Sequence, residues 1–273
     1  MTETISSNLD CSSLSAAAAS VLSCADADDK AALAQQLAPA WYDGPISIIG
    51  QTPAPDRPAR PAVPQLLAPR DMPKRGKAVS PTGRIALLHA LAHIELNAVD
   101  LACDIIARFS VHQLPRSYYD DWVKVASEEG LHFSLLAKRL RELGSSYGEH
   151  PGHDGLWEAA QETAHDLLAR LAIVPLVLEA RGLDVTPMMM KNLRKAGDMP
   201  SADILERIYS DEIGHVAIGQ RWFLHLCDQN SLEPETTWQG LVKKHFKGAL
   251  KPPFNDEARQ LAGVPQSFYT SKS

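Results

Sequence analysis

Four predicted helical stretches carry ionisable side chains at positions where the core of a helical bundle is normally apolar. Two of the stretches contain a lone glutamate and the other two contain a Glu-x-x-His motif, and the two types alternate along the chain. These residues are Glu95, Glu129, His132, Glu179, Glu212 and His215. Each lone glutamate precedes the next motif by a similar distance, 34 residues in the first case and 33 in the second. The chain therefore resolves into two matched halves, which is the ligand plan of a dinuclear carboxylate-bridged metal site inside a four-helix bundle.

The chemistry of these side chains favours a metal site over an empty polar core. A buried carboxylate is costly unless it is paired, protonated or bound to metal. Four glutamates on one bundle axis would also repel one another, and two divalent cations remove that repulsion. The i, i+3 spacing of each motif places its Glu and His on one helix face, so each motif can chelate one ion. Because imidazole with carboxylate suits iron or manganese better than calcium or magnesium, we expect two iron ions, with manganese or a mixed iron–manganese pair as the alternative.

Further acidic and imidazole side chains are expected to support the ligands. An acidic residue immediately precedes the glutamate of each motif, Glu128 in the first half and Asp211 in the second. Ligand histidines normally donate their second ring nitrogen to a carboxylate or carbonyl. We therefore expect each acid to orient the motif histidine of the other half. His93 and Asp100 lie on a polar stripe beside the first lone glutamate and complete the expected supporting set.

Hydrophobic periodicity predicts an all-α protein built on a four-helix bundle. The four core helices are expected at about residues 81–109, 117–143, 156–181 and 201–227. The connection at 145–155 is long enough to return along the bundle, which predicts a long crossover between helices two and three. The expected domains are an N-terminal helical and proline-rich extension at 1–79, the bundle at 80–230 and a C-terminal helical extension at 231–273.

Prolines and glycines refine this outline. Pro175 lies four residues before Glu179 and predicts a kink in the third helix, and Gly182 is expected to end that helix. A separate short helix rich in methionine is expected at 186–196.

One or two short helices are expected at 13–37, packing on the main body. The prolines of residues 45–81 exclude long helices, leaving an extended surface segment or a flexible tether. Short helices are also expected at 233–250 and 255–262.

Composition excludes several classes of partner. The formal net charge of −6 argues against nucleic acid, because phosphate binding requires clustered Lys and Arg. The four cysteines are scattered without a Cys-x-x-Cys pair, which fits a reducing cytoplasm. The apolar stretch near the N-terminus has no basic residue before it, which argues against a signal peptide. Without a run of about 18–20 apolar residues, we expect a soluble cytoplasmic protein with no membrane partner.

The sequence resembles the ferritin-like di-iron carboxylate superfamily and, more narrowly, a bacterial family called domain of unknown function four-five-five. The resemblance covers about residues 80 to 265 and is carried by the stretches LLHALAHIELNAVDLACD, ASEEGLHFSLL, YGEHPGHDGLWEAA, VLEARGLDVTP, SDEIGHVAIGQRWF and KPPFNDEARQLAG. It implies a ferritin-like bundle with the same six residues as metal ligands. It implies no substrate, because the superfamily includes hydroxylases, desaturases, peroxidases, radical-generating subunits and iron-storage proteins, and a tRNA-modifying hydroxylase is among the similar relatives.

Three functions are compatible with these features. The first is a di-iron oxidoreductase of the hydroxylase or oxidase type, which uses O₂ or peroxide on an unidentified small-molecule substrate. The complete ligand set favours it, as do about 80 residues before the bundle and 45 after it, which can form the walls of a substrate pocket. The second is iron oxidation, storage or detoxification. The third is a non-catalytic ferritin-like binding protein. A homodimer is one assembly that the sequence leaves open.

Overall fold

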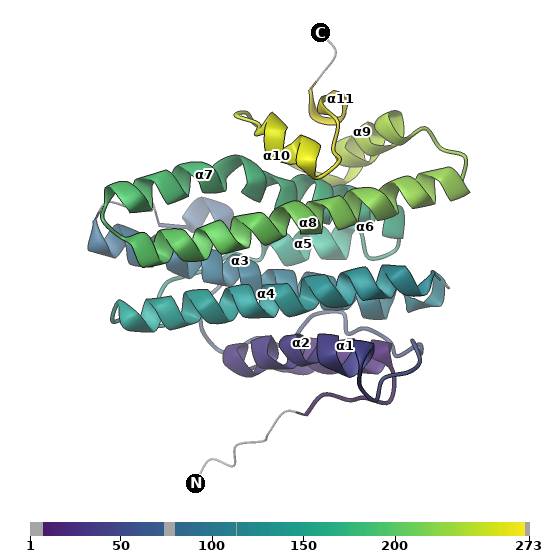
Figure 1. Ribbon diagram of the computed structural model, residues 1–273, viewed down its shortest axis with the longest axis horizontal. Helices are drawn as coiled ribbons and strands as arrows, with labels where there is room; N and C mark the ends of the chain where they lie inside the picture. The colour runs from purple at the N-terminus through teal and green to yellow at the C-terminus, as the bar shows by residue number, and fades with distance from the viewer. Residues whose placement is uncertain (1–7, 74–79, 113, 271–273) are drawn as a thin grey trace. The chain divides into compact units, whose positions relative to one another are not determined.

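The computed structural model describes residues 8–73, 80–112 and 114–270 (Figure 1). These residues group into two compact units. The first unit contains residues up to 74 together with 85–154, and the second contains 75–84 together with 155–273. Within the described ranges the regular structure is helical, apart from one isolated parallel β-bridge between Leu66 and Gly152. The all-α class is therefore confirmed. The four-helix arrangement and its crossover concern the relation between the two units and stay predictions.

The helices of the first unit follow the expected pattern closely. They are α1 (Leu14–Ser23), α2 (Ala27–Tyr42), the 3₁₀ turns η1 (Pro69–Asp71) and η2 (Ser110–His112), α3 (Pro81–Arg108), whose first four residues belong to the second unit, and α4 (Arg116–Glu142). Capping side chains set the start of several helices. Ser13 Oγ accepts a hydrogen bond from the Ala16 N–H at 3.2 Å, and Ser80 Oγ accepts one from the Gly83 N–H at 3.1 Å. Each bond satisfies one of the backbone donors that a helix N-terminus leaves unpaired.

Helix α2 packs closely against α4. Gly130 in α4 permits this approach, because a Cβ at that position would lie 2.6 Å from the Ala31 carbonyl oxygen. Polar contacts extend along the same pair of helices. Gln35 donates to Ser134 Oγ at 3.1 Å, and Trp41 Nε1 donates to an Asp120 carboxylate oxygen at 2.7 Å. The N-terminal helices thus share the core of the unit that contains α4.

The proline-rich segment is extended, as predicted, and it is anchored to the first unit. The Leu14 N–H donates to the Ile48 carbonyl at 2.9 Å, and the Ala59 N–H donates to the Leu22 carbonyl at 2.8 Å. Farther along, the Leu67 N–H donates to the Gly152 carbonyl at 2.9 Å. These backbone bonds hold the described part of the segment in place, which favours the surface-segment account over a free tether. Residues 74–79, at its end, and residues 1–7 lie outside the described residues.

The second unit corrects the prediction for the third helix. Its elements are α5 (Gly155–Glu162), α6 (Leu167–Ile173), the π-helical turn η3 (Val174–Glu179), α7 (Ala180–Lys195), α8 (Met199–Gln229), α9 (Pro234–His245), α10 (Asp256–Leu261) and α11 (Gln266–Tyr269). The expected single helix is interrupted before Asp166, whose carboxylate caps α6. Gly182 does not end the helix, because it keeps a negative φ, and α7 continues to Lys195. Gly197 has the positive φ of 77° that terminates it.

The C-terminal helices are attached to the second unit by buried polar contacts. Arg259 of α10 lies 2.8 Å from an Asp184 carboxylate oxygen, and both side chains are buried. The Arg259 guanidinium also lies 4.5 Å from the centre of the Tyr269 ring. In α9, Trp238 Nε1 donates to the Ala172 carbonyl at 3.2 Å. The two expected C-terminal helices are confirmed with shorter bounds, and these contacts join them to α6 and α7.

Helix α3 passes a length and composition test for a membrane span, which the sequence analysis did not anticipate. Its most apolar window has a mean hydropathy of 1.4, but 72% of that window is buried inside the structure. A mostly buried apolar helix is typical of the core of a soluble protein, and the structure is consistent with one.

Candidate metal centre

The first unit contains a buried cluster of glutamate and histidine side chains. Helix α3 supplies Glu95, and α4 supplies Glu129 and His132. Glu95 is 5% exposed and the other two are fully buried. His132 Nδ1 lies 3.2 Å from Glu95 Oε2 and 3.3 Å from Glu129 Oε2, and the potential ligand atoms of the three residues lie within 4.8 Å of one another. This buried group can hold a metal ion.

The apolar stripe of α4 brings the motif into the core. The residues of this stripe are all buried, and they are Tyr118, Trp122, Val125, Glu129, His132, Leu136 and Leu140. Because the motif residues are three apart, the same face that buries the aromatic and aliphatic side chains also buries the carboxylate and the imidazole. The burial of Glu129 and His132 on this face agrees with the sequence pattern.

The second unit repeats the same local geometry in its own motif. Helix α8 carries Glu212 and His215, and His215 Nδ1 lies 3.4 Å from Glu212 Oε1. The His215 side chain is fully buried and that of Glu212 is 13% exposed. In both motifs the imidazole therefore turns the same ring nitrogen, Nδ1, toward the glutamate of the preceding turn. This agreement supports the interpretation of the chain as two matched halves.

Glu179 is the last residue of the π-helical turn η3. The irregularity that Pro175 predicted appears here as a widened turn, because proline cannot donate the backbone bond of a regular α-helix. Gly219 of α8 packs directly on Pro175. A Cβ at Gly219 would overlap the Pro175 Cβ and lie 2.5 Å from its Cγ. The backbone that carries Glu179 is thus held against α8 by a contact that needs glycine.

The two acidic residues beside the motifs also occupy matched environments. Lys124 Nζ lies 2.6 Å from a Glu128 carboxylate oxygen, and Arg207 Nε lies 2.6 Å from an Asp211 carboxylate oxygen. Each cation precedes its acid by four residues on the same helix. The expected bond from each acid to the histidine of the other half would join the two units, and it stays a prediction.

Asp100 and His93 belong to a polar network of the first unit. Lys30 Nζ and an Arg60 nitrogen contact the two Asp100 oxygens at 2.6 and 3.0 Å. Burial raises the pKa of Asp100, and the two cations oppose that shift. Tyr147 pairs with His93 Nδ1 at 2.9 Å. Burial lowers the pKa of His93 to about 4, against the opposing effect of its bond to the His153 carbonyl.

This network brings in residues that the sequence analysis did not select, namely Lys30, Arg60 and Tyr147. The sequence contained a signal for Lys30, which is a lone cation at the start of an alanine- and leucine-rich helix face. The structure shows that Lys30 is fully buried. The expected role of His93 and Asp100 beside the metal ligands is not shown by these contacts and stays a prediction.

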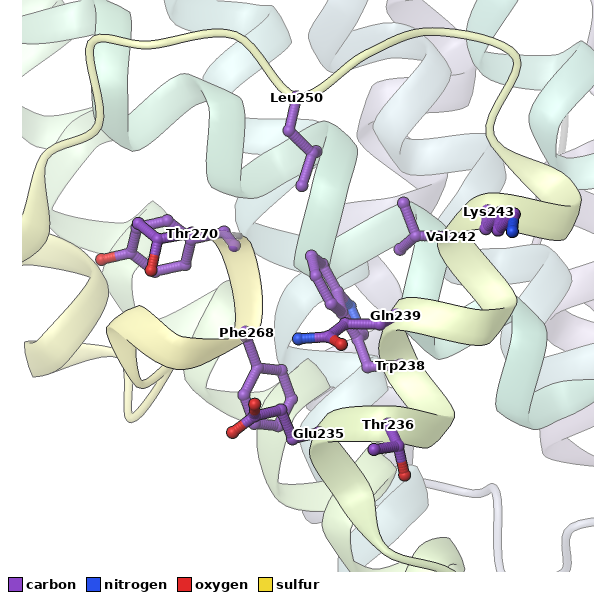
Figure 2. Close-up of a pocket in the computed structure, with 10 residues that line it drawn as sticks. Glu235, Thr236, Trp238, Gln239, Val242, Lys243, Leu250, Phe268 and Thr270 are labelled. Carbon is purple, nitrogen blue, oxygen red and sulfur yellow. The ribbon is translucent and has the colours of Figure 1, made fainter. Parts of the chain in front are cut away.

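One cavity of the second unit is lined by none of the six predicted ligands. It has a volume of about 570 Å³ and lies beside α9 and α11, where the aromatic rings of Trp238 and Phe268 form part of its wall (Figure 2). Its other lining residues are Glu235, Thr236, Gln239, Val242, Lys243, Leu250, Tyr269 and Thr270.

Comparison with known proteins identifies relatives without assigning an activity. Residues 23–270 match the model of the family described as "Protein of unknown function (DUF455)". A protein of Haemophilus influenzae (strain Rd), described as an uncharacterized protein, is 42% identical over 213 residues, which cover 76% of this chain and 74% of the relative. No solved structure matches the chain.

Proposed function

We propose, from the premise that the chain belongs to the DUF455 family, that it is a ferritin-like metalloprotein with a dinuclear centre. The proposed metals are two iron ions, with manganese or a mixed pair as the alternative. The proposed ligands are Glu95, Glu129, His132, Glu179, Glu212 and His215. The observation that carries the proposal is the buried group of Glu95, Glu129 and His132, in which one imidazole nitrogen faces two carboxylates.

The donor set of this group fits a transition metal. Burial penalises the negative charge of two neighbouring carboxylates unless a cation balances it. A divalent cation balances two carboxylates, and the nitrogen donor favours iron or manganese over calcium and magnesium. The matched Nδ1 geometry of the second motif supports an equivalent role for Glu212 and His215. The lone Glu179, placed by the π turn, corresponds to Glu95 of the first half.

Other side chains near the ligands would accept the ring protons of the histidines and exclude water. Each motif histidine turns Nδ1 toward its own glutamate, so its ring proton belongs on Nε2 when Nδ1 binds metal. We assign the acceptors of these protons to the acids beside the motifs, with Asp211 serving His132 and Glu128 serving His215. Iron bound to such ligands supplies redox chemistry with O₂ or peroxide. The apolar residues around the motifs exclude water from the site.

Within this proposal, the protein is an oxidoreductase that acts on a small-molecule substrate in the cytoplasm. The extensive N-terminal and C-terminal segments support an enzyme, because a storage protein has little need of additional segments that enclose a substrate pocket. Helix α2, the proline-rich segment and α10 are each fixed to their own unit by specific contacts. The four cysteines are free thiols, as suits a reducing compartment.

Metal content tests the centre itself. The full-length protein, loaded anaerobically with Fe²⁺ and desalted, is expected to retain about two iron ions per chain. Glu129→Gln and Glu212→Gln should each reduce that content, because each removes the carboxylate of one motif. The matched control is Glu142→Gln, which changes an exposed glutamate of α4 that pairs with Arg139. Wild-type protein that is folded by circular dichroism but retains no iron or manganese would refute the proposal.

Oxygen consumption then separates the enzyme from the storage alternative. The reduced, iron-loaded protein is expected to consume O₂ slowly alone and faster when a substrate from a metabolite library is added. Rapid O₂ consumption that depends only on added Fe²⁺, by a large closed oligomer in light scattering, would support iron oxidation and storage instead. Iron-loaded protein that reacts with neither O₂ nor peroxide would exclude both.

A further inference from the structure

The second unit contains a third Glu-x-x-His motif that the sequence analysis did not select. Glu162 is the last residue of α5, and His165 follows in the turn before α6. The sequence between them is Thr163-Ala164. Unlike the motifs of α4 and α8, this one lies at a helix end with exposed side chains. A motif in this position is accessible to a ligand from solvent.

A buried histidine from a distant part of the chain lies against this motif. His245 is the last residue of α9 and is 6% exposed, and neither of its ring nitrogens has a hydrogen-bond partner within the part of the chain that the structure describes. Its Nδ1 lies 3.5 Å from Glu162 Oε1, and its ring centre lies 5.9 Å from that of His165. Buried imidazole nitrogens are normally bonded, so this side chain has an unmet requirement for a ligand.

His245 and Glu162 also line a pocket of about 140 Å³. Glu158 and Leu178 form other parts of its wall, and the segment that follows α9 closes one side. The pocket therefore presents a carboxylate and an unbonded imidazole to the same space. All of these residues belong to the second unit.

We propose that Glu162, His165 and His245 form a second metal site, for Zn²⁺ or a transition ion with similar preferences, and that its open coordination position faces this pocket. Three protein ligands with one open position form a recurring zinc arrangement. Two imidazoles with one carboxylate exclude calcium and magnesium as the preferred ions, since both favour oxygen donors.

Two of the observed separations agree with such a site. Zinc bonds of about 2.0–2.2 Å to nitrogen and oxygen place two tetrahedral donor atoms about 3.3 Å apart, close to the separation of His245 Nδ1 and Glu162 Oε1. The same bonds place the centres of two coordinated imidazole rings about 5–6 Å apart, which includes the observed ring separation. The potential ligand atoms of the three residues do not all lie within 4.8 Å of one another, so completing the site requires rotation of the exposed His165 side chain.

The second site is independent of the proposed dinuclear centre. None of its three residues belongs to the six ligands of that centre, so substitutions here leave those ligands intact. A competition titration with a chromophoric zinc chelator therefore measures this site as the difference in bound zinc between wild type and a variant. The full-length protein is titrated as wild type and as His165→Ala and Glu162→Gln, whose altered side chains are exposed and leave the core unchanged.

Wild-type protein is expected to bind one zinc ion more than His165→Ala. Glu162→Gln should lower the affinity for that ion by at least about tenfold. The matched control is His112→Ala, which removes an exposed histidine from η2 of the first unit and should leave the titration unchanged. Cobalt(II) provides a second readout, because its visible absorption should decrease by one site's contribution in His165→Ala but not in His112→Ala. Superimposable zinc titrations of wild type and His165→Ala would overturn the proposal, as would an equal loss in His112→Ala.

Discussion

The contact between Gly219 and Pro175 predicts a large difference between two alanine substitutions in one helix. Gly214 and Gly219 both lie inside α8, and an added Cβ at Gly214 meets no atom within 4 Å. At Gly219 the added Cβ lies 2.5 Å from Pro175 Cγ, whereas carbon atoms in contact are about 3.5–4.0 Å apart. The helix or the proline ring must therefore move by about 1 Å.

The magnitude follows by comparing the two variants. Glycine to alanine in a helix interior stabilises by about 1 kcal/mol at either position, so this contribution cancels between them. Overpacking costs about 1–3 kcal/mol, and the upper end applies because Pro175 is a rigid ring attached to the backbone. Gly219→Ala is therefore expected to be about 3 kcal/mol less stable than Gly214→Ala.

Urea unfolding followed by far-UV circular dichroism measures this difference. The variants should differ in the midpoint of unfolding with similar slopes. In addition, Gly219→Ala should lower iron retention if it displaces η3 and with it Glu179. Unfolding free energies that agree within about 0.5 kcal/mol for the two variants would refute the overlap, because they would show that α8 and η3 separate without cost.

Three further predictions concern buried polar groups. Burial lowers the pKa of His89 to about 4, with His150 and His93 adding to the shift and Glu149 opposing it, so the unfolded chain binds more protons between about pH 4 and 6.5. The unfolding free energy should fall as pH decreases through that window. His89→Asn should reduce the slope of unfolding free energy against pH by the equivalent of about one proton, as measured by urea unfolding at several pH values. Equal slopes for wild type and His89→Asn would contradict this prediction. Lys30→Met leaves the fully buried Asp100 with Arg60 as its remaining cation, and unfolding should show a loss of about 3 kcal/mol that Lys30→Met/Asp100→Leu partly recovers; no recovery would argue against the pair. Arg259→Met removes the buried one of the two cations beside Asp184 and leaves the more exposed Arg181. Thermal unfolding should report a loss of about 3 kcal/mol, whereas an unchanged midpoint would show that the Arg259 contact of α10 contributes nothing to the second unit.

Local periodicity accounts for what could be predicted of the fold and of the candidate site. An amphipathic stripe and an i, i+3 spacing depend on helix geometry alone, and this geometry is the same in every protein. For this reason the stripe of α4, the shared face of Glu129 and His132, and the equivalent face of Glu212 and His215 followed from the residues themselves.

Contacts between distant segments could not be derived in this way. Glycine often ends a helix, but α7 continues through Gly182, because the backbone there keeps a negative φ. Lys30 meets Asp100 across 70 residues, and His245 meets Glu162 across 83. No spacing in the sequence identifies either pair of residues as a contact.

The sequence by itself therefore determined the helical class, the identity of the candidate ligands and the face of each helix on which the motif residues lie. The tertiary structure alone decided that α2 is buried against α4, that a proline and a glycine shape the turn carrying Glu179, and that a buried imidazole lies beside a third Glu-x-x-His motif. The physical reason is that helix periodicity is a property of neighbouring residues, whereas close packing and buried polar pairing depend on which surfaces meet after the chain has folded.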